Sequence, residues 1–163
     1  EDKDEKLIGY LAKNGHWTPF GHAMITLRET VPIFVARQRF KHTVGFCYNE
    51  VSRRYVKDEP TFYLPDAWRA TAIYNTSLDI YNEMLDAGVC AEQARMILPQ
   101  GMMTSYYVTG SLAAWARAYH LRIEATAQKE IRDLAAMWND NISPIFPKSW
   151  DALTLEENND GTN

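Results

Sequence analysis

Residues 37–55 gather most of the side chains that could bind a small anionic molecule. This run holds four arginines, one lysine, one histidine and a single glutamate, in a chain whose formal net charge is -4. The planar guanidinium group donates paired hydrogen bonds that match phosphate and carbonyl oxygens. The run therefore predicts a pocket for a phosphorylated polar molecule, and a nucleotide fits that description. The alternative is a basic surface that is exposed to solvent.

Positive charge is concentrated in this part of the chain. Residues 28–57 contain seven lysines or arginines and two acids, whereas the whole chain has 17 basic and 21 acidic residues. Proteins that bind nucleic-acid polymers usually present a broad basic surface, because each phosphate contact releases counterions. The charge pattern favours a single bound anion and argues against a nucleic-acid polymer as partner.

Length and composition predict one domain with a substantial core. The chain has 163 residues, of which 46% are hydrophobic and 12% aromatic, and this is enough to bury an apolar interior. Its two cysteines are too few for a disulfide framework, and neither a secretory leader nor an apolar run of membrane-spanning length is evident. These features predict a cytoplasmic protein that does not enter a membrane.

The histidines and cysteines form no recognisable metal or nucleophile motif. The four histidines stand at positions 16, 22, 42 and 120, and no HxxxH or CxxC pair with zinc spacing occurs. Cys47 has no flanking acid–base partner, which favours a packing role over nucleophilic catalysis. The sequence therefore predicts no metal site.

Local patterns in the first part of the chain predict a helix, a loop, a strand and a second helix. The first helix is amphipathic and is expected to end near residues 14–15, which are Asn and Gly. Residues 16–22 predict a loop, and the alternation in residues 23–31 predicts a strand. Pro32 can open the next helix, because its missing N–H and fixed φ do no harm in a first turn.

The helix that follows this strand is expected to direct two cations to one side. Arg37 and Lys41 are four residues apart and would share a helical face. Ile33, Ala36 and Phe40 would turn towards the core. The pattern therefore predicts a helical origin for part of the anion site.

Further helices are expected in the second half of the chain. Asp66 is a possible N-cap for a helix that ends at Gly88. Two more helices are predicted at about 104–120 and 124–139. Apolar stripes consist of Tyr74, Leu78, Tyr81 and Leu85 in the first of the three, and Ala127, Ile131, Leu134 and Trp138 in the last. The domain is expected to span 1–150, followed by a mobile tail over 151–163.

Several motifs occur in a fixed order along the chain. They are TPFGH at 18–22, VPIFVARQRFKH at 31–42, NEVSRRY at 49–55, ARMILP at 94–99 and HLRIEATAQKEI at 120–131. Together they closely resemble the flavin-dependent thymidylate synthase (ThyX) family, whose signature joins TPFEH, a PIFVARQ helix, RHRxxSxNE and SxRY. The resemblance covers roughly residues 1–140. It implies a single α/β (α+β) domain in which helices flank a small mixed or antiparallel sheet, and it implies that the N-terminal segment of the family is absent here.

The resemblance also implies an activity. A family member would convert dUMP to dTMP, with methylenetetrahydrofolate as carbon donor and with FAD, reduced by NADPH, as the source of hydride. It would be a homotetramer whose active sites are shared between subunits. Two alternatives stay open: a related flavin-dependent dUMP hydroxymethylase, and a nucleotide-binding homologue that has lost catalysis.

Individual residues receive roles from the same resemblance. Arg122 matches an arginine that stabilises negative charge on the pyrimidine and is the expected catalytic residue, while Arg95 matches one that reaches the substrate phosphate from a neighbouring subunit. The residues expected to bind substrate are Gln38, Arg39, Lys41, Glu50, Ser52, Arg53, Arg54, Arg95 and Arg122. The residues expected to bind the flavin are Thr18, Lys41, His42, Thr43, Asn49, Glu50, Ser111 and Arg117.

Some positions depart from the family pattern. Lys41, His42 and Thr43 stand where the family has RHR. Gly21 replaces the glutamate of TPFEH, and Ala113 stands where an arginine is frequent. These differences change the charges around the expected flavin and phosphate contacts, and they are what keeps the non-catalytic alternative open.

Overall fold

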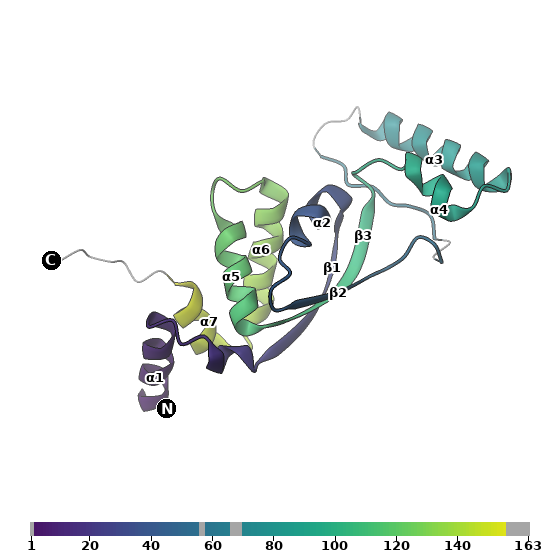
Figure 1. The fold of residues 1–163 in the computed structure, drawn as a ribbon. Helices are drawn as coiled ribbons and strands as arrows, with labels where there is room; N and C mark the ends of the chain where they lie inside the picture. The colour runs from purple at the N-terminus through teal and green to yellow at the C-terminus, as the bar shows by residue number, and fades with distance from the viewer. Residues whose placement is uncertain (1, 56–57, 66–69, 156–163) are drawn as a thin grey trace. The chain divides into compact units, whose positions relative to one another are not determined.

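The computed structural model describes residues 2–55, 58–65 and 70–155 (Figure 1). Its elements in chain order are α1 (Asp2–Lys13), the 3-10 helix η1 (Thr18–Gly21), β1 (Met24–Pro32), α2 (Ile33–Arg39), β2 (Phe46–Glu50), α3 (Ala70–Asp86), α4 (Ala91–Ala94), the 3-10 helix η2 (Arg95–Ile97), β3 (Met103–Ser111), α5 (Leu112–Ile123), α6 (Lys129–Ile142) and α7 (Pro147–Thr154). The three strands form one sheet of order β1-β3-β2. The predicted α/β class, with a small sheet and several helices, is confirmed.

Strands β1 and β3 run antiparallel, as hydroxyl pairs across them show. The side chains of Thr26 and Thr109 are hydrogen-bonded at 2.8 Å, and those of Thr30 and Ser105 at 2.7 Å. Residue numbers rise along one strand while they fall along the other, which is the antiparallel register. Cross-strand hydroxyl pairs of this kind stabilise a sheet and help to fix its register.

The chain forms two compact units, and each takes residues from all three strands. The first unit consists of Glu1–Thr26, His42–Cys47 and Thr109–Asn163, and the second of Leu27–Lys41 and Tyr48–Val108. In the first unit α5 packs against α6 and α7, and α1 packs against α7. In the second unit α3 packs against α4 and η2.

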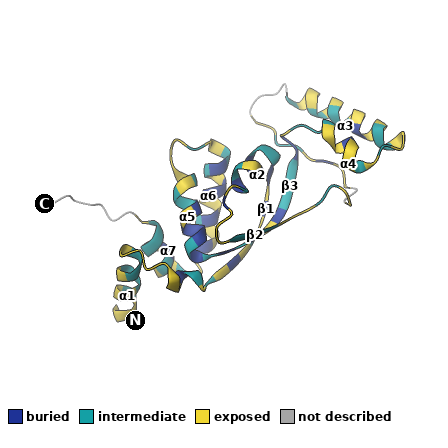
Figure 2. Ribbon diagram, viewed as in Figure 1, coloured by how far each residue is buried: buried dark blue, intermediate teal, exposed yellow. Residues whose placement is uncertain are grey.

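Tryptophan rings form the core of the first unit. Trp115, Trp138 and Trp150 are all fully buried. Figure 2 shows buried residues along α5 and α6. The Trp115 and Trp138 ring centroids are 5.5 Å apart in an edge-to-face arrangement, and the Trp115 indole N–H donates to the Ile25 carbonyl at 3.3 Å. Ile131, Leu134 and Trp138 of the predicted stripe are buried on α6. This core holds α5, which carries several of the predicted site residues, in a fixed place within the unit.

The predicted helix over 104–120 is wrong in its first half. Strand β3 occupies Met103–Ser111, and α5 begins at Leu112. Tyr106 and Val108 are buried while Tyr107 between them is exposed, which is the two-residue period of a strand, and aromatic and β-branched residues favour strands. Ser111 then caps α5, because its Oγ accepts a hydrogen bond from the Ala114 N–H at 3.2 Å.

Helix α2 is shorter than predicted. It ends at Arg39, with Phe40 as its C-cap, so Lys41 lies in a turn and does not share a helical face with Arg37. The Tyr48 hydroxyl donates to the Arg39 carbonyl at 3.2 Å, which satisfies a carbonyl at the helix end that would otherwise need the N–H of a further turn. The cationic face predicted for this helix is therefore wrong.

Other predictions are corrected in part. Residues 16–22 include η1 and are not wholly a loop, and α3 buries only Tyr81 of its predicted stripe. Helix α7 extends to Thr154, so the predicted tail begins as a helix. Asp66, the predicted N-cap, and residues 156–163 lie outside the described residues. Within the described ranges, no helix is both long and apolar enough to cross a bilayer.

Candidate active site

The predicted site residues fall into two groups, one in each compact unit. The second unit contains Gln38, Arg39, Lys41, Asn49, Glu50, Ser52, Arg53, Arg54 and Arg95. The first unit contains Thr18, His42, Thr43, Ser111, Arg117 and Arg122. Most of the residues predicted to bind substrate thus belong to one unit, and most of those predicted to bind the flavin belong to the other.

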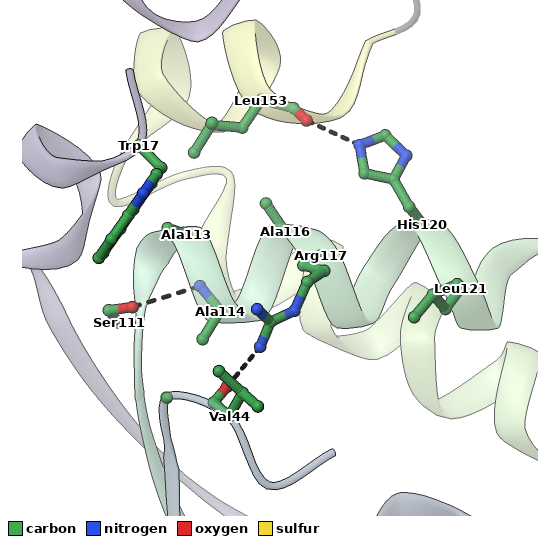
Figure 3. A pocket seen from close by; sticks show the side chains of 11 residues that line it. Trp17, Val44, Ser111, Ala113, Ala114, Ala116, Arg117, His120, Leu121 and Leu153 are labelled. Carbon is green, nitrogen blue, oxygen red and sulfur yellow. Dashed lines mark hydrogen bonds between the residues drawn. The ribbon is translucent and has the colours of Figure 1, made fainter. Parts of the chain in front are cut away.

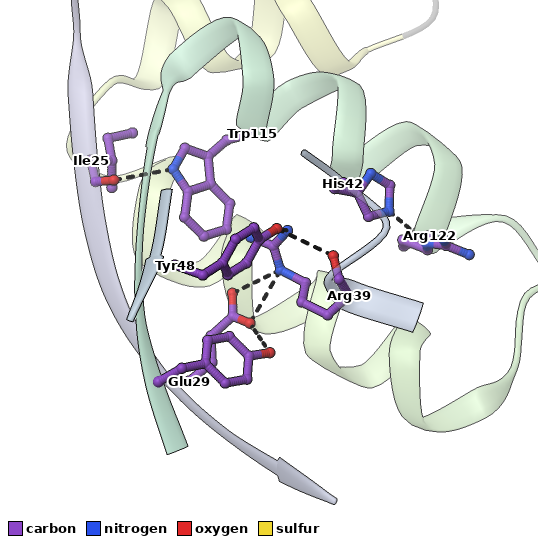
Figure 4. Close-up of polar contacts among 8 residues, drawn as sticks. Ile25, Glu29, Arg39, His42, Tyr48, Trp115 and Arg122 are labelled. Atoms are coloured by element: carbon purple, nitrogen blue, oxygen red, sulfur yellow. Dashed lines mark hydrogen bonds and ion pairs between the residues drawn. The ribbon is translucent and has the colours of Figure 1, made fainter. Parts of the chain in front are cut away.

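Arg39 does not lie where a ligand can reach it. Its side chain is 0% exposed, and its Nε is 3.2 Å from a carboxylate oxygen of Glu29. Its Nη1 donates to the Tyr48 hydroxyl at 2.5 Å (Figure 4). The structure thus corrects the expectation that Arg39 contacts substrate directly and gives it a buried partner within the second unit. Its effect on a ligand would pass through the end of α2.

Two tyrosines complete this buried group. The Tyr106 hydroxyl donates to a Glu29 carboxylate oxygen at 2.5 Å. Burial raises the pKa of the Tyr48 hydroxyl to about 12, although the nearby Arg39 charge opposes the shift. Burial, together with the Glu29 charge, also raises the pKa of Tyr106 far above its ordinary value. Both hydroxyls therefore stay protonated at neutral pH, and they donate to Glu29 and to the end of α2.

Arg54 and Arg95 both donate to Glu92, one to its carboxylate and the other to its backbone carbonyl. Arg54 Nε is 3.0 Å from a Glu92 carboxylate oxygen, and Arg95 Nε donates to the Glu92 backbone carbonyl at 3.3 Å. A backbone hydrogen bond, followed by the one from Arg54, lowers the pKa of Glu92. All three side chains are exposed, so two arginines predicted to bind substrate lie close together on one surface of the second unit.

Glu50, Ser52 and Arg53, which are also predicted to bind substrate, lie at the end of β2 and in the segment after it. Thr104 of β3 donates to Glu50 at 2.6 Å, and the Arg54 backbone N–H donates to the Ser52 hydroxyl at 3.3 Å. Arg53 donates to the backbone carbonyl of Asp58 and lines a cavity of about 260 Å³. Gln38 is half-buried at the end of α2, and both Lys41 and Asn49 are exposed.

A larger cavity of about 920 Å³ lies within the first unit. It runs along α5 and includes Ser111 and Arg117, which were predicted to bind the flavin (Figure 3). Arg117 donates to the Val44 backbone carbonyl. At the far end, a His120 ring nitrogen lies 2.7 Å from the Leu153 carbonyl oxygen of α7.

The chemistry of this cavity fits a flavin dinucleotide. Its volume is within the range of roughly 300–1,000 Å³ that is usual for ligand and cofactor sites. Small side chains of α5 line one side: Ala113, Ala114 and Ala116. These leave space for a flat ring, and the Arg117 guanidinium is suited to a phosphate. Thr18 opens η1, and Thr43 is exposed next to Val44 on the loop that lines the cavity.

Arg122 is held by a neutral histidine. Its Nε donates to His42 Nε2 at 2.8 Å (Figure 4), and His42 is only 9% exposed. An imidazole nitrogen can accept this bond only when it carries no proton, so His42 must hold its proton on Nδ1. The bond uses a single Arg122 N–H, and the two terminal amino groups of the guanidinium can still pair with ligand oxygens. A flavin contact of His42 stays a prediction.

Two features of these sites were missed by the sequence reasoning. Glu29 occupies an inward position of β1, as Ile25 and Val31 do, and an acid at such a position signals a buried cationic partner. Trp17 also lines the larger cavity, and no sequence pattern distinguishes it from a surface residue. Among the described residues, no group of three or more potential metal ligands is found.

Comparisons with known proteins identify the family. The profile described as "Thymidylate synthase complementing protein" matches residues 1–148. A flavin-dependent thymidylate synthase of Thermotoga neapolitana is 37% identical over 149 residues, which cover 83% of this chain and 68% of the relative. A flavin-dependent thymidylate synthase of Thermosipho africanus is 34% identical over 170 aligned positions, which cover 89% of this chain and 72% of the relative.

A third relative, the flavin-dependent thymidylate synthase of Thermosipho melanesiensis, is 35% identical over 159 aligned positions, which cover 82% of this chain and 69% of the relative. The family predicted from the motifs is thereby confirmed. The matched range extends through α5 and α6 and contains the positions of His42, Arg54, Arg95 and Arg122. The chain therefore belongs to the thymidylate synthase complementing protein family, and the three relatives named above are flavin-dependent thymidylate synthases.

Proposed function

We propose that this protein is a flavin-dependent thymidylate synthase that converts dUMP to dTMP. Its carbon donor would be methylenetetrahydrofolate, and its cofactor FAD with NADPH as reductant. The names of the relatives, which are similar over most of the chain, support this proposal. Within the structure, the observation that carries it furthest is the guanidinium of Arg122 held at 2.8 Å by a nearly buried histidine.

Arg122 would act on the pyrimidine ring. Adding a carbon at C5 of uracil requires electron density at that carbon, and negative charge then builds on N3 and the ring carbonyls. A positioned guanidinium stabilises such charge, and electrostatic stabilisation of this kind is commonly the largest catalytic contribution. Because His42 orients the side chain through Nε, the arginine would need little reorganisation when the charge develops.

The second unit would bind the nucleotide phosphate. Arg54 and Arg95 both contact Glu92, and a phosphate could accept paired hydrogen bonds from both guanidinium groups. The Ser52 hydroxyl lies in the turn that precedes Arg54 and could donate to the same anion. Glu50, whose carboxylate is fixed by Thr104, would position the ribose or the flavin.

The cavity of the first unit would hold FAD, which when bound supplies the hydride that completes the methyl group. Thr18, Thr43, Ser111 and Arg117 would contact it from η1, from the loop after α2 and from α5. The apolar lining would exclude water from the bound ring. Arg117 would offset phosphate charge at this end of the cavity.

Active sites would be shared between the subunits of a homotetramer. Exposed apolar side chains on α3, among them Ile73 and Ile80, support the presence of an interface in the second unit. Arg95 would then serve a site together with residues of another subunit. Neither a nucleic-acid polymer nor a membrane is a proposed partner, and a cytoplasmic location is proposed from the cysteine usage alone.

The proposed reaction is tested by the product that forms from dUMP. The protein is incubated without oxygen with FAD, dUMP, methylenetetrahydrofolate and NADPH, and the nucleotide is then measured by mass spectrometry. A methyl addition is expected. A hydroxymethyl addition would instead show a hydroxymethylase, and unchanged dUMP beside bound, reduced flavin would show a homologue without catalysis.

Two substitutions test whether His42 orients Arg122. His42→Phe keeps a ring but removes the acceptor, and it should raise the dissociation constant of dUMP roughly tenfold or more, as expected for a lost hydrogen bond to a charged group. His42→Gln offers an oxygen near the place of Nε2 and should restore most of the affinity. Isothermal titration measures both. A larger loss with His42→Gln than with His42→Phe would show that the histidine acts through packing.

A further inference from the structure

Trp17 is an exposed aromatic residue that lines the larger cavity of the first unit. It precedes η1 and is 64% exposed. Figure 3 shows its ring near the start of α5, close to Ala113, with Arg117 further along the same helix. The other three tryptophans among the described residues are fully buried. A large flat side chain is thus kept at the edge of a cavity and not in the core.

The Trp17 ring lies close to a glycine at the end of η1. A Cβ built on Gly21 would lie 3.3 Å from Trp17 Cζ3 and 3.6 Å from Cε3. The ring therefore lies close to Gly21, and a side chain there would require the ring to shift by a few tenths of an ångström or more. This glycine stands where the TPFEH motif has a glutamate, so the same substitution that removes a carboxylate also makes room for the indole.

Other parts of the cavity lining have small side chains. Gly45 has φ +80, and a Cβ there would lie 2.9 Å from the Ala114 Cβ, so the loop approaches α5 closely. Ala113 and Ala116 add only methyl groups to the lining. Arg117, the guanidinium in this lining, is anchored to Val44. A planar apolar platform and a cation in one cavity match the two parts of a dinucleotide, a fused ring and a phosphate.

We propose that Trp17 is a stacking platform for a fused heteroaromatic ring of the flavin dinucleotide. This inference rests on the proposed function, because it takes the cavity as the flavin site. Aromatic side chains stack on such rings face to face. Replacing one stacking side chain with alanine commonly weakens binding by roughly tenfold to a hundredfold. Trp17 would then contact the ring close to Gly21, where the TPFEH motif has a glutamate.

The test measures binding and needs no turnover. Wild-type protein, Trp17→Phe, Trp17→Ala and the control Tyr10→Ala are titrated with FAD, FMN and ADP by calorimetry, with flavin fluorescence followed in parallel. Tyr10 is an exposed aromatic residue of α1 that is not among the residues lining the cavity. Trp17→Ala should weaken FAD binding at least tenfold on the order of magnitude and relieve flavin quenching, while Trp17→Phe keeps most of the affinity and Tyr10→Ala all of it.

The smaller ligands identify the ring. A loss with FMN but not ADP assigns the isoalloxazine, and a loss with ADP but not FMN assigns the adenine; either supports the inference. Gly21→Val should weaken FAD binding in wild type but add nothing in Trp17→Ala, because the ring it displaces is already gone. FAD affinity that is unchanged in Trp17→Ala, or absent from the wild type, would overturn the inference.

This outcome is separable from the proposed activity. If the protein forms no dTMP but binds FAD in a way that depends on Trp17, the proposed function is wrong and the stacking role of Trp17 is supported. If the protein forms dTMP but its FAD affinity does not depend on Trp17, only the stacking role of Trp17 is wrong.

Discussion

Replacing Arg122 with alanine is expected to lower kcat for the conversion of dUMP by about 100-fold or more. The guanidinium would bind the uracil ring and would also stabilise the charge that develops as the ring reacts, so kcat should fall and kcat/KM should fall further. Arg122→Lys keeps the charge but loses the planar fork and the Nε donor to His42, and it should recover only a small part of the rate. Initial rates at saturating and limiting dUMP measure both constants.

A matched control removes another cation from the same unit. Lys129 forms an exposed pair with Asp133 at 2.6 Å on α6, and Lys129→Ala should leave kcat unchanged within about twofold, because exposed pairs contribute little to stability. If Arg122→Ala raised KM while kcat stayed as in the wild type, Arg122 would only bind substrate, and the assignment as catalytic residue would be wrong.

The elements that could be read from sequence are those with a strong local pattern. Helix α6 shows its buried stripe of Ile131, Leu134 and Trp138 at helical spacing, and α1 ends where Asn14 and Gly15 predict. Strand β1 shows an alternation of apolar and polar residues along the sequence. In each case the residues that decide the structure are neighbours along the chain.

The elements that were missed depend on partners distant in sequence. Residues 104–111 are a partial exception, because their aromatic and β-branched residues already favour a strand, and pairing with β1 and β2 then makes them the central strand. Short strand β2 lies within a charged run that has no clear alternation. Helix α7 begins at a proline, and the burial of Trp150 beneath α5 and α6 is what stabilises it.

The candidate site divides in the same way. Arg54, Arg95 and Arg122 could be located from sequence, because each lies in a recognisable sequence motif. They do not reveal that Arg39 is buried, since its partner Glu29 lies ten residues earlier on another element. Nor do they reveal that His42 accepts from Arg122, a contact that spans 80 residues.

The buried pair of Glu29 and Arg39 is expected to give the largest change in stability. Arg39→Met leaves the Glu29 carboxylate buried without its cation and should lower the free energy of unfolding by roughly 3–5 kcal/mol. Glu29→Leu leaves the guanidinium of Arg39 buried and should cost a similar amount. Urea denaturation at fixed protein concentration measures both, because the stability of an oligomer depends on concentration.

The double variant separates pairing from burial. Glu29→Leu with Arg39→Met removes both charges and should recover most of the loss, since a buried ion pair is often no more stabilising than well-packed apolar side chains. Tyr106→Phe belongs in the same background, because its hydroxyl donates to Glu29 and would otherwise be left buried without an acceptor. Exposed Lys129→Ala again provides the comparison and should cost at most about 1 kcal/mol.

The same variants show why a charged pair would lie beneath this site. If the double variant is stable but binds dUMP more weakly than wild type, the pair fixes the end of α2, where Gln38 and Lys41 are expected to contact substrate, more sharply than apolar packing does. Tyr48 also contributes to that position, because it accepts from Arg39 Nη1 and donates to the Arg39 carbonyl. If the double variant lost as much free energy of unfolding as the two single variants together, the pairing would be contradicted, because the effects of coupled residues are not additive.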